Sequence, residues 1–289
     1  MSLALLSNIL IDGFAYAMIL FMITVGLSMT MGLMRVTNLA HGAFAMYGGF
    51  LAATFSAQVA APPLLAMGLA IAAVAVAALP IERWLIRRFY RRSELDQMLV
   101  TIGLMFIMIA LANLFFGSAI TGVKLPSFLV GSVEIGGRTV PMHRIAVATL
   151  GLAVLGLLWF SVERSAFGIK VRAAVDNAPI AQAVGINTAR IYAITFASGA
   201  ALAALGGIAG AELLPMEPAY AAKYLVTFLA VVAVGGHGTV FGSFLAALLL
   251  GMVDTSMKYL VPQLSSVAFF VTMFIVIILR PQGLFGKHA

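Results

Sequence analysis

The stretch Arg164–Ile186, RSAFGIKVRAAVDNAPIAQAVGI, is the longest charge-bearing segment with helical character in a chain that is otherwise almost entirely apolar. Apolar runs near 143–161 and 190–211 flank it, and each has about the 20 residues that a helix needs to cross a bilayer. Because both neighbours are predicted spans, this segment lies on one face of the membrane, where a soluble protein can contact it.

The composition indicates the same class of protein. Of 289 residues, 63% are hydrophobic and only 9% are charged, whereas about a quarter of the residues of a soluble domain are charged. We therefore predict an all-α, polytopic integral membrane protein with a single transmembrane domain over residues 1–289. The absence of cysteine excludes disulfides, thiolate catalysis and metal sites with cysteine ligands.

Apolar runs predict about eight to nine transmembrane helices, with possible broken or re-entrant segments. They lie near 8–31, 38–58, 62–82, 95–116, 143–161, 190–211, 222–235, 239–258 and 263–280. The first 34 residues contain no Lys or Arg, so the first run is expected to be a span and not a cleaved signal peptide.

The distribution of charge predicts the orientation. Although the net charge is +7, no nucleic-acid partner is expected, because the basic residues gather in short loops between spans. They are concentrated in 83–92, in 164–190, and at Arg280 and Lys287. Cytoplasmic loops are enriched in Lys and Arg, so these three regions are expected inside, with the N-terminus outside and the C-terminus in the cytoplasm.

Residues 117–142 are predicted to be an external loop, since glycines and two prolines interrupt the apolar pattern there. Within it, SVEIGGRTV (132–140) is typical of a small β-hairpin. The loop is either a simple connector or part of a docking surface for an extracytoplasmic partner.

Two polar, glycine-containing clusters lie within the apolar spans and are candidates for a translocation path. One contains Arg35, Thr37, Asn38 and His41, and the other is 235–239. Backbone groups freed where a helix breaks can bind the carboxylate and ammonium groups of an amino acid. The candidate path residues are Asn38, His41, Gly42, Tyr47, Gly235, Gly236, His237 and Gly238. The alternative is close helix packing, with each histidine hydrogen-bonded across an interface.

A weak internal repeat accompanies these clusters: HGAFAMYGGFLAA (41–53) resembles HGTVFGSFLAA (237–247). If it is real, it indicates the internal pseudo-symmetry from which many transporters are built. Small residues from Gly199 to Gly210 predict a tightly packed helix face. Asp254 and Lys258 have the spacing of an interfacial ion pair, and a proton relay is the less favoured alternative.

The polar segment about 164–189 contains the signals of a short helix over 178–184. Asp176 or Asn177 can cap it, Pro179 suits its first turn, and Gly185 can end it. Gly168 is expected to break the run before Lys170 and Arg172. Such a capped helix is typical of a protein-docking element, and an amphipathic helix lying on lipid is the alternative. The candidate coupling residues are Gly168, Arg172, Asp176, Asn177, Pro179, Gly185 and Ile186.

The chain contains neither a metalloprotease motif nor a GxSxG motif, and no phosphate-binding GxxxxGK[ST] loop. No catalytic site, metal or other cofactor is therefore expected. Any ATP hydrolysis must come from another chain.

The sequence resembles the membrane permease subunits of branched-chain amino acid ABC importers, the LivH-type subunit in particular. The similarity covers essentially the whole chain and is carried by five blocks. They are Gly32-Leu33 with 38–42, 167–177, 183–187, 234–242 and RPQGLFG (280–286). The chain departs from the usual pattern at Ala43, Phe44 and His237.

This resemblance implies a multi-pass subunit in a bacterial plasma (inner) membrane, with the 167–187 block coupling to ATPase subunits. The implied partners are a second, LivM-like permease, two ABC ATPases and an extracytoplasmic solute-binding protein. The implied solutes are leucine, isoleucine and valine. Alternatives are an ABC permease for urea, amides, sugars or another small polar solute, a stand-alone ion-coupled transporter, and, least favoured, a membrane-embedded enzyme.

Overall fold

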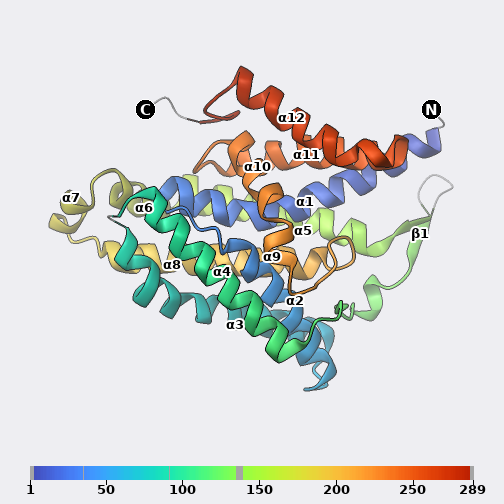
Figure 1. Cartoon of the computed structure of the whole chain (residues 1–289), viewed down its shortest axis with the longest axis horizontal. Helices are drawn as coiled ribbons and strands as arrows, with labels where there is room; N and C mark the ends of the chain where they lie inside the picture. Colours follow the sequence, from blue (N-terminus) through green and yellow to red (C-terminus); the bar gives the residue numbers. More distant parts are fainter. Residues whose placement is uncertain (1–2, 35, 91, 135–138, 287–289) are drawn as a thin grey trace.

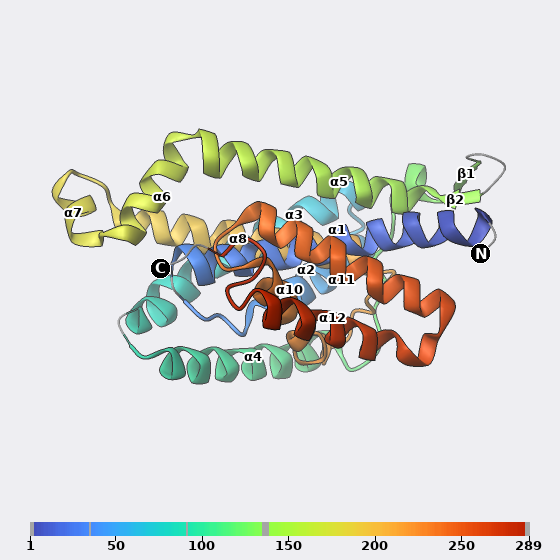
Figure 2. The ribbon, with the colours of Figure 1, turned by 90° about the horizontal axis from the view of Figure 1, so that it is seen from above.

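Long helices that run roughly parallel to one another dominate the computed structural model (Figures 1 and 2). The structure describes residues 3–34, 36–90, 92–134 and 139–286. The elements before the polar segment are α1 (Leu3–Leu33), α2 (His41–Ala57), α3 (Pro63–Pro80), η1 (Ile81–Leu85), η2 (Ile86–Phe89), α4 (Glu94–Phe116), η3 (Ser127–Leu129), β1 (Ser132–Glu134), β2 (Thr139–Pro141), α5 (Met142–Trp159) and η4 (Phe160–Arg164). They are followed by α6 (Ala166–Asp176), α7 (Ala178–Ala183), α8 (Thr188–Gly210), α9 (Tyr220–Lys223), α10 (Leu225–Gly235), α11 (Val240–Leu260), η5 (Pro262–Leu264) and α12 (Ser265–Leu279).

Within the described residues, seven helices are long and apolar enough to cross a membrane. They are Leu5–Gly32, Pro63–Phe89, Glu94–Phe116, Met142–Arg164, Thr188–Gly210, Val240–Leu260 and Pro262–Leu279. The fold is therefore that of a polytopic helical membrane protein. The predicted spans 38–58 and 222–235 form shorter helices, because residues 36–40 are not helical and the chain leaves helical geometry at Tyr224.

Two predicted spans are longer than expected. The helix of α3 continues through a π turn, η1, and a 3₁₀ turn, η2, so the basic residues up to Arg88 lie on a helical extension and not in a loop. α5 likewise ends in a π turn, η4. Single π turns of this kind are frequent at functional sites.

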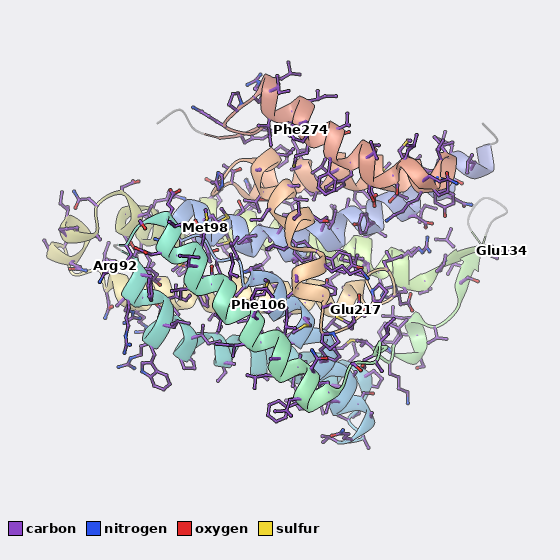
Figure 3. The ribbon with its side chains drawn as sticks, viewed as in Figure 1. Arg92, Met98, Phe106, Glu134, Glu217 and Phe274 are labelled. Atoms are coloured by element: carbon purple, nitrogen blue, oxygen red, sulfur yellow. The ribbon has the colours of Figure 1, made fainter. Side chains whose placement is uncertain are left out.

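α1 is the central helix: residues 15–30 are all buried, and the helix packs against α11, α8, α5 and α10. α12 is peripheral, with only 11% of its span buried. Phe106 of α4 and Phe274 of α12 are 58% and 60% exposed and lie on the outside of the bundle (Figure 3). These outer faces are suited to lipid or to another membrane chain.

Glycines allow the central helices to touch backbone to backbone. A Cβ on Gly26 of α1 would lie 2.5 Å from the carbonyl oxygen of Gly199 in α8, and one on Gly207 would lie 2.1 Å from that of Ala45 in α2. The predicted small-residue face of α8 is thus confirmed as a packing face, in agreement with small residues at interfaces between membrane helices.

The two ends of the bundle differ. α6 and α7 project beyond one end, and the β1–β2 hairpin lies at the other (Figure 2). The predicted hairpin is confirmed, with Ser132 paired to Pro141 and Glu134 to Thr139; its predicted turn, 135–138, lies outside the described residues. Arg92 and Glu134 are at opposite ends of the long axis (Figure 3).

Candidate coupling and translocation sites

The projecting α6–α7 arm, residues 165–187, is held together by local capping. The Ser165 hydroxyl accepts hydrogen bonds from the amides of Phe167 and Gly168, at 3.2 and 3.4 Å, and begins α6. The prediction that Gly168 breaks this segment is wrong, since α6 runs through it. Its glycine is needed for packing, because a Cβ there would lie 1.9 Å from the Val162 carbonyl oxygen. Arg172 also donates to that oxygen, at 2.6 Å.

The predicted short helix is confirmed as α7. Of the two candidate caps, Asn177 is the one used, because its Oδ1 accepts from the Ile180 amide at 3.1 Å. Pro179 lies in the first turn, and Gly185, with φ of +87°, ends the helix. The Ile186 amide then donates to the Ala181 carbonyl at 2.9 Å, which matches a Schellman-type stop.

α7 presents apolar side chains to its surroundings. Ile180 is 61% and Val184 71% exposed, and the adjacent Asp176 and Asn177 are also exposed. In contrast, Ile186 is half-buried and packs with the small core of Val171, Ala174 and Ile191. The arm therefore has one face fixed on α8 and another that is free among the described residues.

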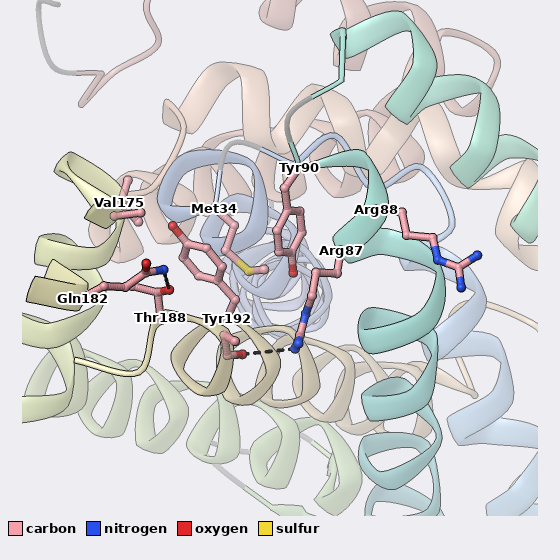
Figure 4. A pocket seen from close by; sticks show the side chains of 10 residues that line it. Met34, Arg87, Arg88, Tyr90, Val175, Gln182, Thr188 and Tyr192 are labelled. Carbon is pink, nitrogen blue, oxygen red and sulfur yellow. Dashed lines mark hydrogen bonds between the residues drawn. The ribbon is translucent and has the colours of Figure 1, made fainter. Parts of the chain in front are cut away.

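A pocket of about 480 Å³ separates α7 from the extension of α3 (Figure 4). Tyr192 donates to the Ala174 carbonyl at 2.7 Å, and Gln182 donates to the Thr188 hydroxyl at 2.7 Å. Arg87, on the opposite wall, donates to the Ala189 carbonyl at 3.3 Å (Figure 4). The arm and the α3 extension thus meet at the first turn of α8.

Glu82, in the π turn η1, is a buried acid that sequence reasoning missed. Its carboxylate is fully buried and accepts from Arg87 Nε at 3.1 Å, from Arg87 Nη2 at 2.8 Å and from the Tyr90 hydroxyl at 2.6 Å. Burial, and then the hydrogen bond to Glu82, raise the pKa of Tyr90 well above its ordinary value. The hydroxyl therefore stays protonated and remains a donor.

Residues 36–40, the non-helical segment, are buried between α1 and α2. Gln97 and Thr101 of α4 bind their backbone: Thr37 N donates to Gln97 Oε1 at 3.0 Å, and Leu39 N to Thr101 Oγ1 at 3.1 Å. Irregular backbone at membrane depth requires such internal partners. Sequence reasoning missed both side chains, although two polar residues four apart on an apolar helix were a visible signal. Arg35, of the predicted cluster, lies outside the described residues.

The candidate path residues near this segment are mostly packed. His41, the first residue of α2, is 2% exposed, and its Nε2 lies 2.9 Å from the Ile23 carbonyl oxygen of α1. Gly42 faces the ring of Phe228, and the Tyr47 hydroxyl donates to the Met108 carbonyl at 3.0 Å. Asn38 differs: it is fully buried, and its Nδ2 has no hydrogen-bond partner among the described residues.

The second cluster, 235–239, forms the turn between α10 and α11. Gly236 and Gly238 have φ of +86° and +80°, which explains the glycines. The Gly238 amide donates to the Ser28 carbonyl at 3.1 Å, and a Cβ on Gly32 would lie 2.0 Å from Gly238 Cα. His237 is exposed. Both predicted clusters therefore pack on the second half of α1, with one histidine buried and the other exposed.

Several charged residues at the hairpin end form ion pairs. Asp12 of α1 forms an ion pair with Arg144 of α5 and accepts from the Tyr259 hydroxyl of α11. His143 Nδ1 lies 3.1 Å from Glu212 Oε2. The predicted Asp254–Lys258 pair is confirmed, at 2.6 Å.

Within the described residues, the seven candidate spans, the buried non-helical segment and the projecting capped arm are those of a multi-pass helical membrane protein. The family model for the permease component of branched-chain amino acid transport systems matches residues 9–278, and the chain belongs to this family. The chain is thus the permease component of an ABC transport system and is not itself catalytic. Membership of this family implies ATPase and binding-protein partners.

Characterised relatives match along nearly their whole length. The high-affinity branched-chain amino acid transport permease LivH of Salmonella typhimurium is 28% identical, with 92% of this chain and 91% of the relative covered. BraD of Pseudomonas aeruginosa is 25% identical, with 96% and 95% covered. Among solved structures, PsaBC from Streptococcus pneumoniae in complex with Fab is similar in fold, with a TM-score of 0.50, 11% identity, and coverage of 94% and 90%.

Proposed function

We propose that this chain is the transmembrane permease subunit of an ATP-driven importer of leucine, isoleucine and valine, or close relatives, across the bacterial plasma membrane. The observation that carries the proposal is α7: a rigidly capped helix, projecting from one end of the bundle, with Ile180 and Val184 exposed. An exposed apolar patch beside charged residues is typical of a protein contact. The partner it fits is an ATPase subunit, since the sequence itself contains no phosphate-binding loop.

The proposed topology places α6–α7 in the cytoplasm and the 117–142 loop outside, against the binding protein. Arg83, Arg88, Lys170 and Arg172 then lie on the cytoplasmic side, as the positive-inside rule expects. α2 with residues 36–40, and α9 with α10, add two shorter passes to the seven long helices. The N-terminus is then outside and the C-terminus inside.

The proposed solute path runs beside residues 36–42 and 235–239. Its strongest support is Asn38, whose buried amide donor lacks a partner among the described residues. Buried donors are nearly always satisfied, and a solute carboxylate would satisfy this one. His41 is the first residue of α2, and His237 precedes the first residue of α11 by three positions. These similar placements support the proposed pseudo-symmetry between the two copies of the repeat.

A stand-alone ion-coupled transporter is the alternative from another class, and it requires intramembrane acids that can titrate. Asp254 and Glu82 are the buried acids among the described residues, and both are already paired with cations. Neither pair leaves a carboxylate free for ion coupling. Urea, amides and sugars remain the alternative solutes within the ABC class.

The test is reconstitution of this chain in proteoliposomes with a second permease, two ATPases and the binding protein. Labelled leucine uptake should require hydrolysable ATP and all partners, and valine should compete. Uptake by this chain alone, driven by an ion gradient, would contradict the proposal. ATP-dependent uptake of urea in place of leucine would retain the ABC mechanism and change the solute.

A further inference from the structure

A run of polar contacts joins the α6–α7 arm to the non-helical segment 36–40 through the end of α3. We infer that Glu82, Arg87 and Gln97 are positioning residues that transmit movement of the arm to this segment. The inference rests on the proposed docking of α7 to an ATPase. It assigns a role to three residues that lie outside both the arm and the candidate path.

The first link fixes the arm to α8. Tyr192 donates to the Ala174 carbonyl of α6 at 2.7 Å, and Gln182 of α7 donates to Thr188 at 2.7 Å. Beneath these bonds, Ala174 packs with Ile191 of α8. A displacement of α7 therefore displaces the first turn of α8.

The second link fixes the first turn of α8 to the α3 extension. Arg87 bridges the Ala189 carbonyl, at 3.3 Å, and the Glu82 carboxylate, which it binds through two nitrogens. The Tyr90 ring meets that of Tyr192 edge-on, with 5.3 Å between centroids, and its hydroxyl binds Glu82. Glu82 is thus the point at which two contacts from the α8 side converge.

The third link fixes the α3 extension to the path. Gln97 Nε2 donates to the carbonyls of Phe89 and Arg92, at 3.2 and 3.4 Å. The Oε1 atom of the same side chain accepts from Thr37 N at 3.0 Å. One amide therefore binds the carbonyls of Phe89 and Arg92, on either side of Tyr90, and, with its other end, the backbone next to Asn38.

The polar atoms of Glu82 and Gln97 are fully engaged in hydrogen bonds. Both oxygens of Glu82 and both ends of the Gln97 amide are occupied, and both residues are buried, at 0% and 4% exposure. Breaking a buried bond is unfavourable because the remaining group is left desolvated and unpaired. The pocket of about 480 Å³ beside α7 leaves space for the arm to move. Hydrogen-bond networks of this kind can couple two sites energetically. The test therefore measures the coupling between ATP hydrolysis and transport directly.

The test compares Tyr90→Phe with Tyr259→Phe. Each variant removes one hydroxyl that donates to a carboxylate, the first in this run and the second at the hairpin end, on Asp12. Glu82→Gln and Gln97→Met are the stronger changes. In the reconstituted complex, uptake and ATP hydrolysis are measured together, and leucine transported per ATP is the readout.

Glu82→Gln and Gln97→Met should lower leucine per ATP about tenfold, the ordinary size of a coupling effect, with assembly and hydrolysis retained. Tyr90→Phe should lower it less, and Tyr259→Phe should leave it unchanged. The double variant Glu82→Gln/Gln97→Met should be no worse than the poorer single variant, because both interrupt one run. An unchanged ratio, or a parallel loss of uptake and hydrolysis, would show that these residues only support packing.

Hydrogen exchange gives a readout that needs no solute. In detergent-solubilised full-length protein, Glu82→Gln should speed amide exchange in a peptide covering residues 36–40, whereas Tyr259→Phe should not. Unchanged exchange would overturn the inference whatever the transported solute. Absence of ATP-dependent uptake by the wild-type complex would instead contradict the proposed function, so the two failures are distinguishable.

Discussion

The backbone amide of Thr37 donates a hydrogen bond of 3.0 Å to Oε1 of Gln97, which lies 60 positions later in the sequence. This bond fastens the buried, non-helical segment 36–40 to α4 and gives a buried backbone amide a partner within the protein. The non-helical break between α1 and α2 is therefore an ordered part of the fold, stabilised by side chains of α4.

Thr101→Val tests that support. The Thr101 hydroxyl accepts from Leu39 N and contacts the Thr37 carbonyl at 3.2 Å, so valine leaves a buried amide unpaired at nearly constant volume. We expect a loss of about 1–3 kcal/mol of stability, measured as a lower Tm in detergent. Thr149→Val is the matched control, since its exposed hydroxyl bonds only within α5; an equal loss in both variants would contradict this role.

Gly32→Ala tests the contact between α1 and the 235–239 turn. Its Cβ would lie 2.0 Å from both N and Cα of Gly238, and backbone cannot yield as a flexible side chain can. We expect a large drop in the yield of folded protein by size-exclusion chromatography. In the control Gly103→Ala, nothing lies within 4 Å of the new Cβ, and helix propensity should stabilise by about 0.5–1 kcal/mol. Normal folding of Gly32→Ala would show that the two segments are not in contact.

Asp176→Lys tests docking by the arm. Asp176 is exposed at the end of α6, so the substitution changes charge next to Ile180 without disturbing the core. We expect an unchanged Tm and at least about a tenfold weaker association with the ATPase subunit, measured by co-purification at several salt concentrations. Glu134→Lys, at the opposite end of the bundle, should associate normally.

Gly185→Pro is the structural counterpart in the same arm. Gly185 has φ of +87°, and its amide donates to the Gln182 carbonyl at 3.0 Å, whereas proline has a negative φ and no N–H. The end of α7 should unfold locally, with loss of ATPase association and with membrane insertion retained. Normal association of both arm variants would rule out α7 as the docking helix.

His41→Ala and His237→Ala should behave differently. His41 is buried against the Ile23 carbonyl, so its loss should lower both the Tm and leucine uptake. His237 is exposed, and its loss should leave the Tm unchanged and alter uptake or the competition by isoleucine and valine. If neither variant changes uptake or competition, neither histidine contributes to the solute path.

The sequence predicted best those features whose causes are local. α7 follows from three neighbours, Asn177, Pro179 and Gly185, each of which acts on backbone within a few residues, and the small-residue face of α8 is a repeating pattern on one helix. Glu82 was missed because its burial depends on Arg87 and Tyr90 together with a π turn that no spacing rule indicates. Gln97 was missed because its acceptor role exists only once residues 36–40 lie beside α4.

At Gly168 a local signal led to a wrong prediction, because the helix continues through this residue. A glycine in a polar segment is typical of a break, yet here the missing Cβ serves the approach of α6 to the Val162 carbonyl. Likewise, 222–235 was predicted as a full span because the apolar run continues through Tyr224, where the backbone leaves helical geometry. Distinguishing these cases requires knowledge of the neighbouring backbone.

The central position of α1 has a consequence for biogenesis. This helix is synthesised well before its principal neighbours, since α8 and α11 begin more than 150 residues after it ends. Until then its residues 15–30, all buried in the folded bundle, face lipid tails, which tolerate apolar side chains and offer no partner to its glycine-lined surface. Final packing of α1 must therefore follow synthesis of α11, and a chain truncated before residue 240 would leave this helix without one of its two main neighbours.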